Sequence, residues 1–241
     1  MANLDSMAML AALDGVLLVD KPAQLSTHDL LKALKSRFNL SKVGHGGTLE
    51  PNATGLVVLL VGNATSMVND VMGGDRAYRA TIRLGCCTNT YDAEGDVLAE
   101  RSFADVNQKL FENALPEFRG DIFQTPPPYS VIKRSDTPSY SIVPTSSEEA
   151  KARLVHVYRL AIMNFAPPLV ELDLMCTKGV SVRTLAHDLG EQLGCGASLE
   201  SLRRTRCAQF KLEDAMGFME LMKLDPVAFK HRLIPVAGAF D

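Results

Sequence analysis

A glycine-rich loop with a single carboxylate is the segment of this chain best suited to chemistry. It runs from Gly44 to Gly55, reads GHGGTLEPNATG and holds four glycines. Glycine permits sharp turns with positive φ and close approach to a ligand, while Pro51 stiffens the chain directly after Glu50. The loop therefore predicts a site built around the Glu50 carboxylate. A structural turn with a solvated Glu50 stays open as the alternative.

Three familiar kinds of site do not fit this loop. A phosphate-binding loop needs lysine followed by serine or threonine after its second glycine, and this pattern is absent. A hydrolytic acid pair needs a second carboxylate, which the segment lacks. His45 and Glu50 could share a metal, but few other candidate ligands lie near them in the sequence. Taken alone, the loop indicates a site without defining its reaction.

The segments on either side of the loop predict the elements that position it. Gly15 to Val19 is a short apolar run that predicts a buried strand stopped by Pro22. A helix is expected next, capped by Ser26 or Thr27, with an apolar face made of Leu30, Leu31, Leu34 and Phe38. After the loop, the unbroken apolar run Leu56 to Val61 predicts either a strand or the start of a buried helix.

The rest of the chain mixes strands and helices without a regular βαβ period, which favours an α+β fold with a mixed sheet. The pattern predicts a strand at 78–84, a polar turn at 88–95, a helix at 103–118, a loop or edge segment at 124–140, a strand pair at 155–165 and 169–176, and a helix at 182–193 ended by Gly194.

The composition fits one folded core and excludes several classes of protein. The chain has 241 residues, of which 46% are hydrophobic, so wholesale disorder is not expected. Its five cysteines form no CxxC pair, which argues against a zinc site or a disulfide framework. No apolar run is long enough for a membrane span, and the run at 7–13 lacks the basic flank of a signal peptide. We therefore expect a cytoplasmic protein. The net charge of −3 gives no global sign of a nucleic-acid partner.

The loop also resembles the signature GHTGTLDPxATG of the TruB family of tRNA pseudouridine synthases. Six further segments match motifs of that family, in family order, between residue 15 and about residue 215. They are GVLLVDKP at 15–22, the DKxYxxxxxLG-like segment at 74–85, the TxTxDxxG-like segment at 88–95, the PPxYSAxK-like segment at 127–133, the CSKGTYIRTLAxDLG-like segment at 176–190 and the LRRTxxG-like segment that begins at Leu202.

This resemblance implies a fold and an activity. It implies a single pseudouridine-synthase-type catalytic domain at 15–241, with a central mixed, largely antiparallel sheet flanked by helices. Residues 1–14 would form an N-terminal extension, and the C-terminal RNA-binding domain of many relatives would be missing. The implied enzyme is a tRNA-modifying isomerase that flips the T-loop uridine at tRNA position 55, cleaves its glycosidic bond and rejoins the base through carbon. We expect a monomer that binds the T-arm of tRNA, needs no metal or organic cofactor and has no membrane partner.

The motifs also imply roles for residues. Glu50 occupies the position of the family's catalytic aspartate. Tyr78 matches an active-site tyrosine that stacks on the flipped base and assists proton movement. Arg183 matches the arginine that pairs with the acid and keeps it ionised. Predicted substrate-binding residues are His45, Lys21 and Leu202 in the base pocket, and Lys133, Arg203 and Arg204 as phosphate contacts.

The chain departs from the family pattern at its chemical centre. Glutamate replaces aspartate at Glu50, and its extra methylene displaces the carboxylate by about 1 Å, a shift that can cost ~10²-fold in rate. Ser181 stands where the family has tyrosine, and we hypothesise that the lost ring makes room for the longer acid. The segment at 133–151 matches the family's tRNA-contacting insertion only faintly. Two alternatives follow: a tRNA-binding protein that isomerises slowly or not at all, and an enzyme that acts on messenger or ribosomal stem-loops.

Overall fold

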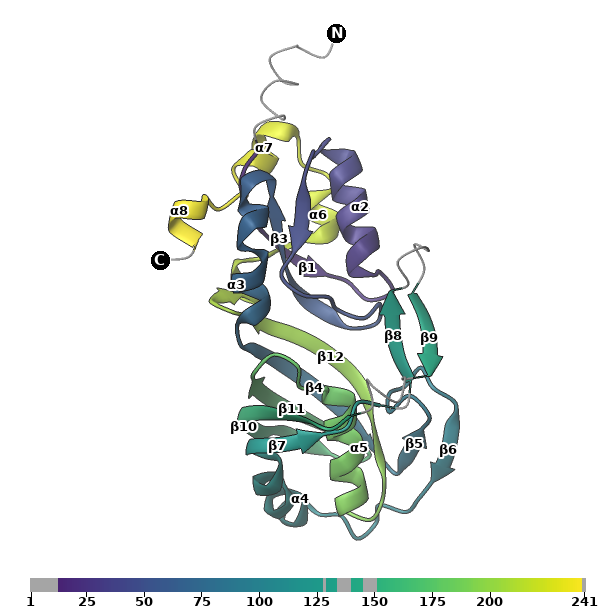
Figure 1. Ribbon diagram of the computed structural model, residues 1–241. Helices are drawn as coiled ribbons and strands as arrows, with labels where there is room; N and C mark the ends of the chain where they lie inside the picture. Colours follow the sequence, from purple (N-terminus) through teal and green to yellow (C-terminus); the bar gives the residue numbers. More distant parts are fainter. Residues whose placement is uncertain (1–12, 128, 134–139, 145–150, 240–241) are drawn as a thin grey trace. The chain divides into compact units, whose positions relative to one another are not determined.

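The computed structural model describes residues 13–127, 129–133, 140–144 and 151–239, and these form two compact units. Unit 1 comprises the described parts of Met1–Arg76 and Arg203–Asp241, and unit 2 comprises those of Ala77–Leu202. The chain passes between the units inside two strands, β4 (Arg76–Leu84) and β12 (Ala197–Cys207) (Figure 1). The predicted extension at 1–14 lies almost wholly outside the described residues.

The strands of unit 1 are arranged around β3 (Thr54–Val61), which continues directly from the Glu50 loop. On one side β3 runs antiparallel to β1 (Gly15–Lys21), and it also pairs antiparallel with β2 (Val43–His45). The second half of β12 lies parallel to the start of β3, with Arg204 opposite Gly55. The short strands β13 (Phe210–Lys211) and β14 (Met216–Gly217) pair with β12 and β1 respectively. Both ends of the loop are thereby fixed to neighbouring strands.

β1 and β3 are buried on both faces, which explains why their sequences are uninterrupted apolar runs. Helix α2 (Thr27–Arg37) begins at the predicted cap, where the Ser26 hydroxyl accepts a hydrogen bond from the amide of Asp29 at 3.0 Å. Leu30 and Leu34 are buried on its inner face. The other helical segments of unit 1 are η1 (Gly62–Met67), α3 (Val68–Gly73), η3 (Leu212–Asp214), α6 (Phe218–Leu221), α7 (Pro226–Lys230) and α8 (Val236–Ala239).

Unit 2 contains the sheet portion in which β12, β4, β11 (Leu169–Cys176), β10 (Arg153–Ala166) and β7 (Gly120–Gln124) follow one another. Its helix α5 (Val182–Gln192) packs Leu185 and Leu189 into the same apolar cluster as Ile82 and Leu172. Phe111 of α4 (Gln108–Ala114) joins this cluster. Smaller elements complete the unit: η2 (Leu115–Phe118), the hairpin of β5 (Cys86–Thr88) and β6 (Val97–Glu100), and the hairpin of β8 (Tyr129–Lys133) and β9 (Tyr140–Pro144).

Most predicted elements are confirmed, as is the α+β class with a mixed, largely antiparallel sheet. The ambiguous run Leu56 to Val61 is a strand. The helix predicted at 103–118 is wrong in extent, because Asn107 caps α4 by accepting from the Leu110 amide and Pro116 lies in a 3-10 turn. The segment at 124–140 contains strand β8, and β12 was not predicted. Within the described ranges, no helix has the length and apolar content needed to cross a bilayer.

Gly55 offers a test of how closely β12 approaches the start of β3. Its φ is +99°, and a Cβ added there would lie 2.3 Å from the Arg204 carbonyl oxygen. Gly55→Ala should therefore lower the free energy of unfolding by roughly 2–4 kcal/mol, through overlap and backbone strain. Gly73→Ala is the control, because nothing lies within 4 Å of the added atom. Urea denaturation of both variants measures the difference, and equal stabilities would contradict the close approach.

Candidate functional site

Side chains from elsewhere in unit 1 hold the main chain of the Glu50 loop. Arg204 of β12 donates through Nη2 to the Gly47 carbonyl and through Nη1 to the Thr48 carbonyl, both at 3.1 Å. Arg76, at the start of β4, donates through Nη2 to the Gly46 carbonyl at 3.0 Å. These are the three successive carbonyl groups that precede Leu49 and Glu50.

Two further side chains fix the loop on either side of Glu50. The Thr27 hydroxyl, at the start of α2, donates to the Leu49 carbonyl at 3.1 Å and accepts from the Leu49 amide at 2.9 Å. Lys21, at the end of β1, donates through Nζ to the Pro51 carbonyl at 2.8 Å. The main chain is therefore hydrogen-bonded immediately before and immediately after the acid, which limits where the carboxylate can lie.

The cations that bind the loop are buried. Lys21 is 0% exposed, Arg204 is 2% exposed and Arg76 is 7% exposed. Burial, and to a smaller extent the neighbouring charge of Arg204, lowers the pKa of the Lys21 amine to about 8. A buried charge is costly unless hydrogen bonds replace its hydration, and here main-chain carbonyls do so. Lys21, predicted as a pocket residue, also donates to the carbonyls of Pro22 and Leu25.

Glu50 itself is partly exposed and follows Leu49, whose side chain is buried. His45 lies at the end of β2, where its Nδ1 accepts a hydrogen bond from the Gly47 amide at 3.3 Å. His45 thus belongs to the same loop as Glu50.

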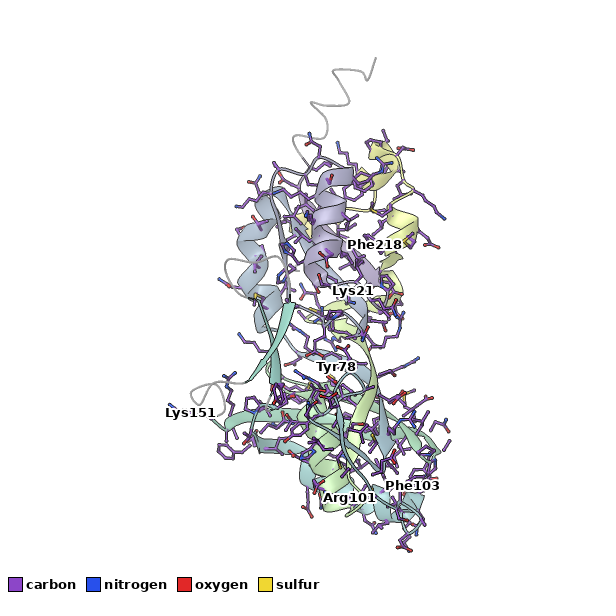
Figure 2. All side chains as sticks on the ribbon, turned by 90° about the vertical axis from the view of Figure 1, so that its right-hand side faces the viewer. Lys21, Tyr78, Arg101, Phe103, Lys151 and Phe218 are labelled. Atoms are coloured by element: carbon purple, nitrogen blue, oxygen red, sulfur yellow. The ribbon has the colours of Figure 1, made fainter. Side chains whose placement is uncertain are left out.

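Arg203 lies beside a cavity of unit 1. Its guanidinium pairs with Asp20 at 2.7 Å and is 40% exposed. The cavity has a volume of about 460 Å³. Lys21 and Phe218, both on its wall, lie in the same part of unit 1 (Figure 2). The cavity is lined by Asp20, Lys21, Pro22, Arg203, Gly217, Phe218, Met219 and Glu220.

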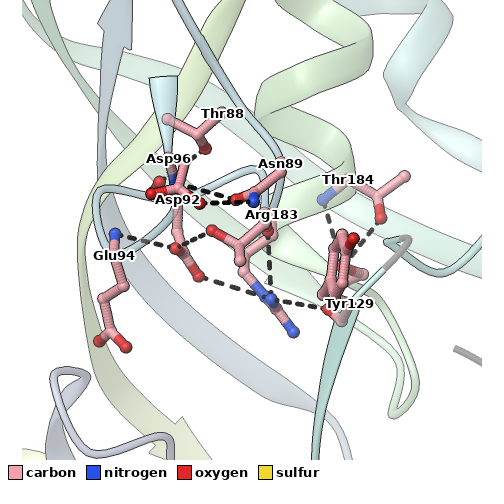
Figure 3. Close-up of polar contacts among 10 residues, drawn as sticks. Thr88, Asn89, Asp92, Glu94, Asp96, Tyr129, Arg183 and Thr184 are labelled. Atoms are coloured by element: carbon pink, nitrogen blue, oxygen red, sulfur yellow. Dashed lines mark hydrogen bonds and ion pairs between the residues drawn. The ribbon is translucent and has the colours of Figure 1, made fainter. Parts of the chain in front are cut away.

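In unit 2, an aspartate-centred turn holds Arg183 (Figure 3). Nη1 of Arg183 donates to the carbonyls of Thr90 at 3.1 Å and Tyr129 at 3.2 Å, and it lies 3.5 Å from Oδ2 of Asp92. Oδ1 of Asp92 accepts from the Thr90 hydroxyl at 2.6 Å and from the Glu94 amide at 3.0 Å. The polar turn predicted at 88–95 therefore binds the Arg183 guanidinium. We call Asp92, Thr90 and Tyr129 the cradle of Arg183.

Ser181 begins the helix that carries Arg183. Its hydroxyl accepts a hydrogen bond from the Thr184 amide at 3.2 Å, the geometry of a helix N-cap. Gln124 binds the main chain of Ser181 on both sides, accepting from its amide at 2.9 Å and donating to its carbonyl at 3.2 Å. The serine that replaces the family's tyrosine thus stabilises the first turn of α5. That it makes room for Glu50 stays a hypothesis.

The other predicted residues lie in unit 2. Tyr78 on β4 and Leu202 on β12 are half-buried, and both pack against the apolar cluster of that unit. Figure 2 labels Tyr78. Lys133 ends β8, and its side chain lies outside the described residues. In the described part of the chain, no three His, Cys, Asp or Glu residues are grouped so as to hold a metal ion.

Sequence reasoning missed three residues that support these groups. In the sequence, Thr27 is a candidate helix cap, Arg76 lies inside a family motif, and Asp92 belongs to the TxTxDxxG-like segment. Asp92 had a detectable signal, because threonine two residues before an aspartate in a glycine-ended turn is typical of side chains that bond the main chain. Arg76 and Thr27 had none, since their partners lie 30 and 22 residues away.

Comparison with known proteins gives two family models that together match most of the chain. The model of the TruB family pseudouridylate synthase N-terminal domain matches residues 35–182. The model of the tRNA pseudouridylate synthase B C-terminal domain matches residues 183–239. The chain belongs to the TruB family. The boundary between the two matches falls at the start of α5, inside unit 2.

Curated TruB proteins and solved structures are similar over nearly the whole chain. Two proteins named tRNA pseudouridine synthase B are those of Opitutus terrae, 43% identical over 228 residues, and Burkholderia pseudomallei, 45% identical over 226 residues. The matches cover 94% and 93% of this chain, and 95% and 74% of those proteins. A chain in the crystal structure of a Cbf5-Nop10-Gar1 complex matches with a TM-score of 0.73 and 25% identity, over 95% of this chain and 62% of that one.

The cradle around Arg183 can be tested through Asp92, whose side chain is 15% exposed. Asp92→Ala removes the acceptor of two hydrogen bonds and the partner of Arg183, so the free energy of unfolding should fall by about 1–3 kcal/mol. Asp96→Ala in the same turn is the control, because Asp96 is exposed and should cost less than about 0.5 kcal/mol. Urea denaturation gives both values. Similar losses for the two variants would contradict the central place of Asp92.

Proposed function

We propose that this chain converts a uridine in the T-loop of tRNA to pseudouridine, with Glu50 as the catalytic carboxylate. Membership of the TruB family gives the reaction class. One observation of the site carries the assignment of the acid: the main chain is hydrogen-bonded on both sides of Glu50, while its side chain stays partly exposed. The rate of such a reaction falls when the reacting carboxylate is displaced by even about 1 Å. The reaction therefore requires a carboxylate that is held in place and accessible to the substrate.

The reaction is an isomerisation, so it needs a positioned acid and no oxidant or second substrate. The glycosidic N1–C1′ bond of the flipped uridine breaks, the uracil rotates, and C5 bonds to C1′; C5 then loses a proton and N1 gains one. A carboxylate can serve as nucleophile on the sugar or base, or as a base on the sugar. We assign Glu50 to this centre and leave these routes open.

Two residues of unit 2 complete the proposal through their places in the family motifs. Tyr78 is assigned to stacking on the flipped base. Arg183 is assigned to pairing with the acid, since an adjacent guanidinium keeps a carboxylate ionised and oriented. The cradle of Asp92, Thr90 and Tyr129 supports the role of Arg183, because an arginine already hydrogen-bonded by the main chain presents its charge in a fixed direction.

The proposal also covers the RNA substrate, the oligomeric state and the cellular location of the enzyme. We infer that the chain acts on the T-arm, as a monomer in the cytoplasm. The rival reading of a tRNA-binding protein without turnover gains no support from the curated relatives, which are named as synthases.

Replacing Glu50 tests the assignment of the acid. Glu50→Gln should remove product formation under single-turnover conditions, because the amide can neither attack nor accept a proton. Glu50→Asp should slow it by up to ~10²-fold, since the loop is fixed and the shorter side chain falls about 1 Å short. Pseudouridine is detected chemically in unmodified tRNA.

The matched control for these variants is Glu213→Gln, an exposed glutamate of unit 1 that pairs with Lys211 and should leave the rate unchanged. Turnover by Glu50→Gln would refute the assignment. A large gain in rate for Glu50→Asp would show that the glutamate is a defect of the site. If the wild-type protein bound tRNA tightly but formed no product, it would be a tRNA-binding protein without turnover, which is the alternative function.

A competition between RNA hairpins tests the proposed specificity for the T-arm. We expect kcat/KM for a T-arm stem-loop to exceed that for ribosomal or messenger hairpins of equal length by at least about tenfold, because correct loop shape is needed to expose the base. A T-arm with cytidine at the target position is the control, and it should bind without product. Equal kcat/KM for all hairpins would instead favour an enzyme of broader RNA specificity.

A further inference from the structure

Arg204 of β12 binds main-chain carbonyls on both sides of Glu50. Its Nη groups bind the carbonyls of Gly47 and Thr48, before the acid, and its Nε donates to the Leu56 carbonyl at 2.7 Å, after it. The main chain of Arg204 lies opposite Gly55 in the parallel pairing of β12 with β3. One residue thus binds the main chain both before and after the acid.

Arg76 binds the same stretch of main chain from another strand. Its Nη2 donates to the Gly46 carbonyl and to the Val71 carbonyl, both at 3.0 Å. The two arginines therefore donate to the carbonyls of Gly46, Gly47 and Thr48, three residues that lie outside the helices and strands. The planar guanidinium has five donors in a fixed fork, which lets one side chain satisfy several acceptors that point the same way.

Gly47 shows that the fit is close. Its φ is +127°, and a Cβ added there would lie 3.3 Å from Nη2 of Arg76 and 3.8 Å from Nη1 of Arg204. An added Cβ would crowd the Arg76 guanidinium slightly, whereas its distance from Arg204 is an ordinary van der Waals contact. The positive φ is the stronger reason for a glycine at this position.

We propose that Arg204, supported by Arg76, is a positioning residue for the synthase reaction, acting through the Glu50 loop and not through RNA. The inference rests on the proposed function, in which Glu50 is the catalytic acid. It replaces the sequence-based prediction that Arg204 contacts phosphate. Arg204 is 2% exposed and its three hydrogen bonds end on main-chain oxygens, whereas a phosphate contact needs a guanidinium at the surface.

The test compares Arg204→Lys with the wild type in kcat, tRNA Kd and the salt dependence of Kd. Arg204 binds its three carbonyls through three separate nitrogens, Nε, Nη1 and Nη2. Lysine keeps the charge but has one nitrogen in place of this planar fork, so the loop shifts. We expect kcat to fall by about 10²-fold. The Kd for tRNA and its salt slope should stay unchanged, because no phosphate contact is lost. Arg206→Lys is the matched control, since Arg206 lies on the same strand and its Nε donates to Ala208, outside the loop.

A double-mutant cycle shows whether Arg204 acts through the acid. If it does, Glu50→Asp and Arg204→Lys both displace the same carboxylate, and the loss in kcat of the double variant should be smaller than the product of the single losses. If the two substitutions acted independently, the loss in kcat of the double variant would equal the product of the two single losses. Arg76→Met and Arg76→Lys give a second route should Arg204→Lys fail to fold, which thermal unfolding would reveal. We expect Arg76→Met to lower kcat by at least about tenfold, and Arg76→Lys to restore most of it because the amine can still donate to several carbonyls.

The possible outcomes are distinct. A fall in kcat with unchanged Kd, and non-multiplicative losses, support the inference. A weaker Kd with a salt slope reduced by about one would instead make Arg204 a phosphate contact. Unchanged kcat in folded Arg204→Lys or Arg76→Met protein would also overturn the inference, with the proposed function left intact. Absence of product with the wild-type protein would refute the proposed function and this inference with it.

Discussion

Buried donors that bind the main chain of the Glu50 loop are the constraint on which the rest of unit 1 depends. An irregular loop inside a protein cannot pair its carbonyl groups in a helix or sheet, so other groups must do so. Lys21, Thr27, Arg76 and Arg204 serve this purpose here. β1, α2, β4 and β12 each deliver one of them, so the loop's conformation depends on four elements that are distant in sequence.

The same solution appears in unit 2, around a different residue. Arg183 is bound by the carbonyls of Thr90 and Tyr129, and the turn that presents the first of these is organised by Asp92. Ser181, which departs from the family pattern, caps the helix that carries Arg183. The two charged groups assigned to the reaction, Glu50 and Arg183, are therefore each held through main-chain contacts within their own unit. Preorganisation of this kind reduces the rearrangement needed when substrate binds.

The sequence was sufficient to predict the elements that obey simple patterns. β1 and β3 are apolar runs because both faces are buried, and α2 and α5 have clear caps and apolar faces. β12 was missed because its alternation is interrupted by arginines, and a run such as Leu202 to Arg206 resembles a solvated surface. Charged residues are almost never fully buried, so the burial of Arg204 could not be predicted without knowing that the loop needs its donors. The site motifs were found and they included Lys21 and Arg204, but the hydrogen bonds of these residues to the loop and the supporting roles of Thr27 and Arg76 were not predicted.

Amide hydrogen exchange in the free protein tests the central claim most directly, because the claim is that the loop is ordered before RNA binds. The Gly46 amide donates to the Val58 carbonyl at 2.8 Å, and the Leu49 amide donates to the Thr27 hydroxyl at 2.9 Å. Both amides should exchange slowly without RNA, and a T-arm stem-loop should change their rates little. Rapid exchange of these amides in the free protein, with protection only when the RNA is bound, would contradict the account.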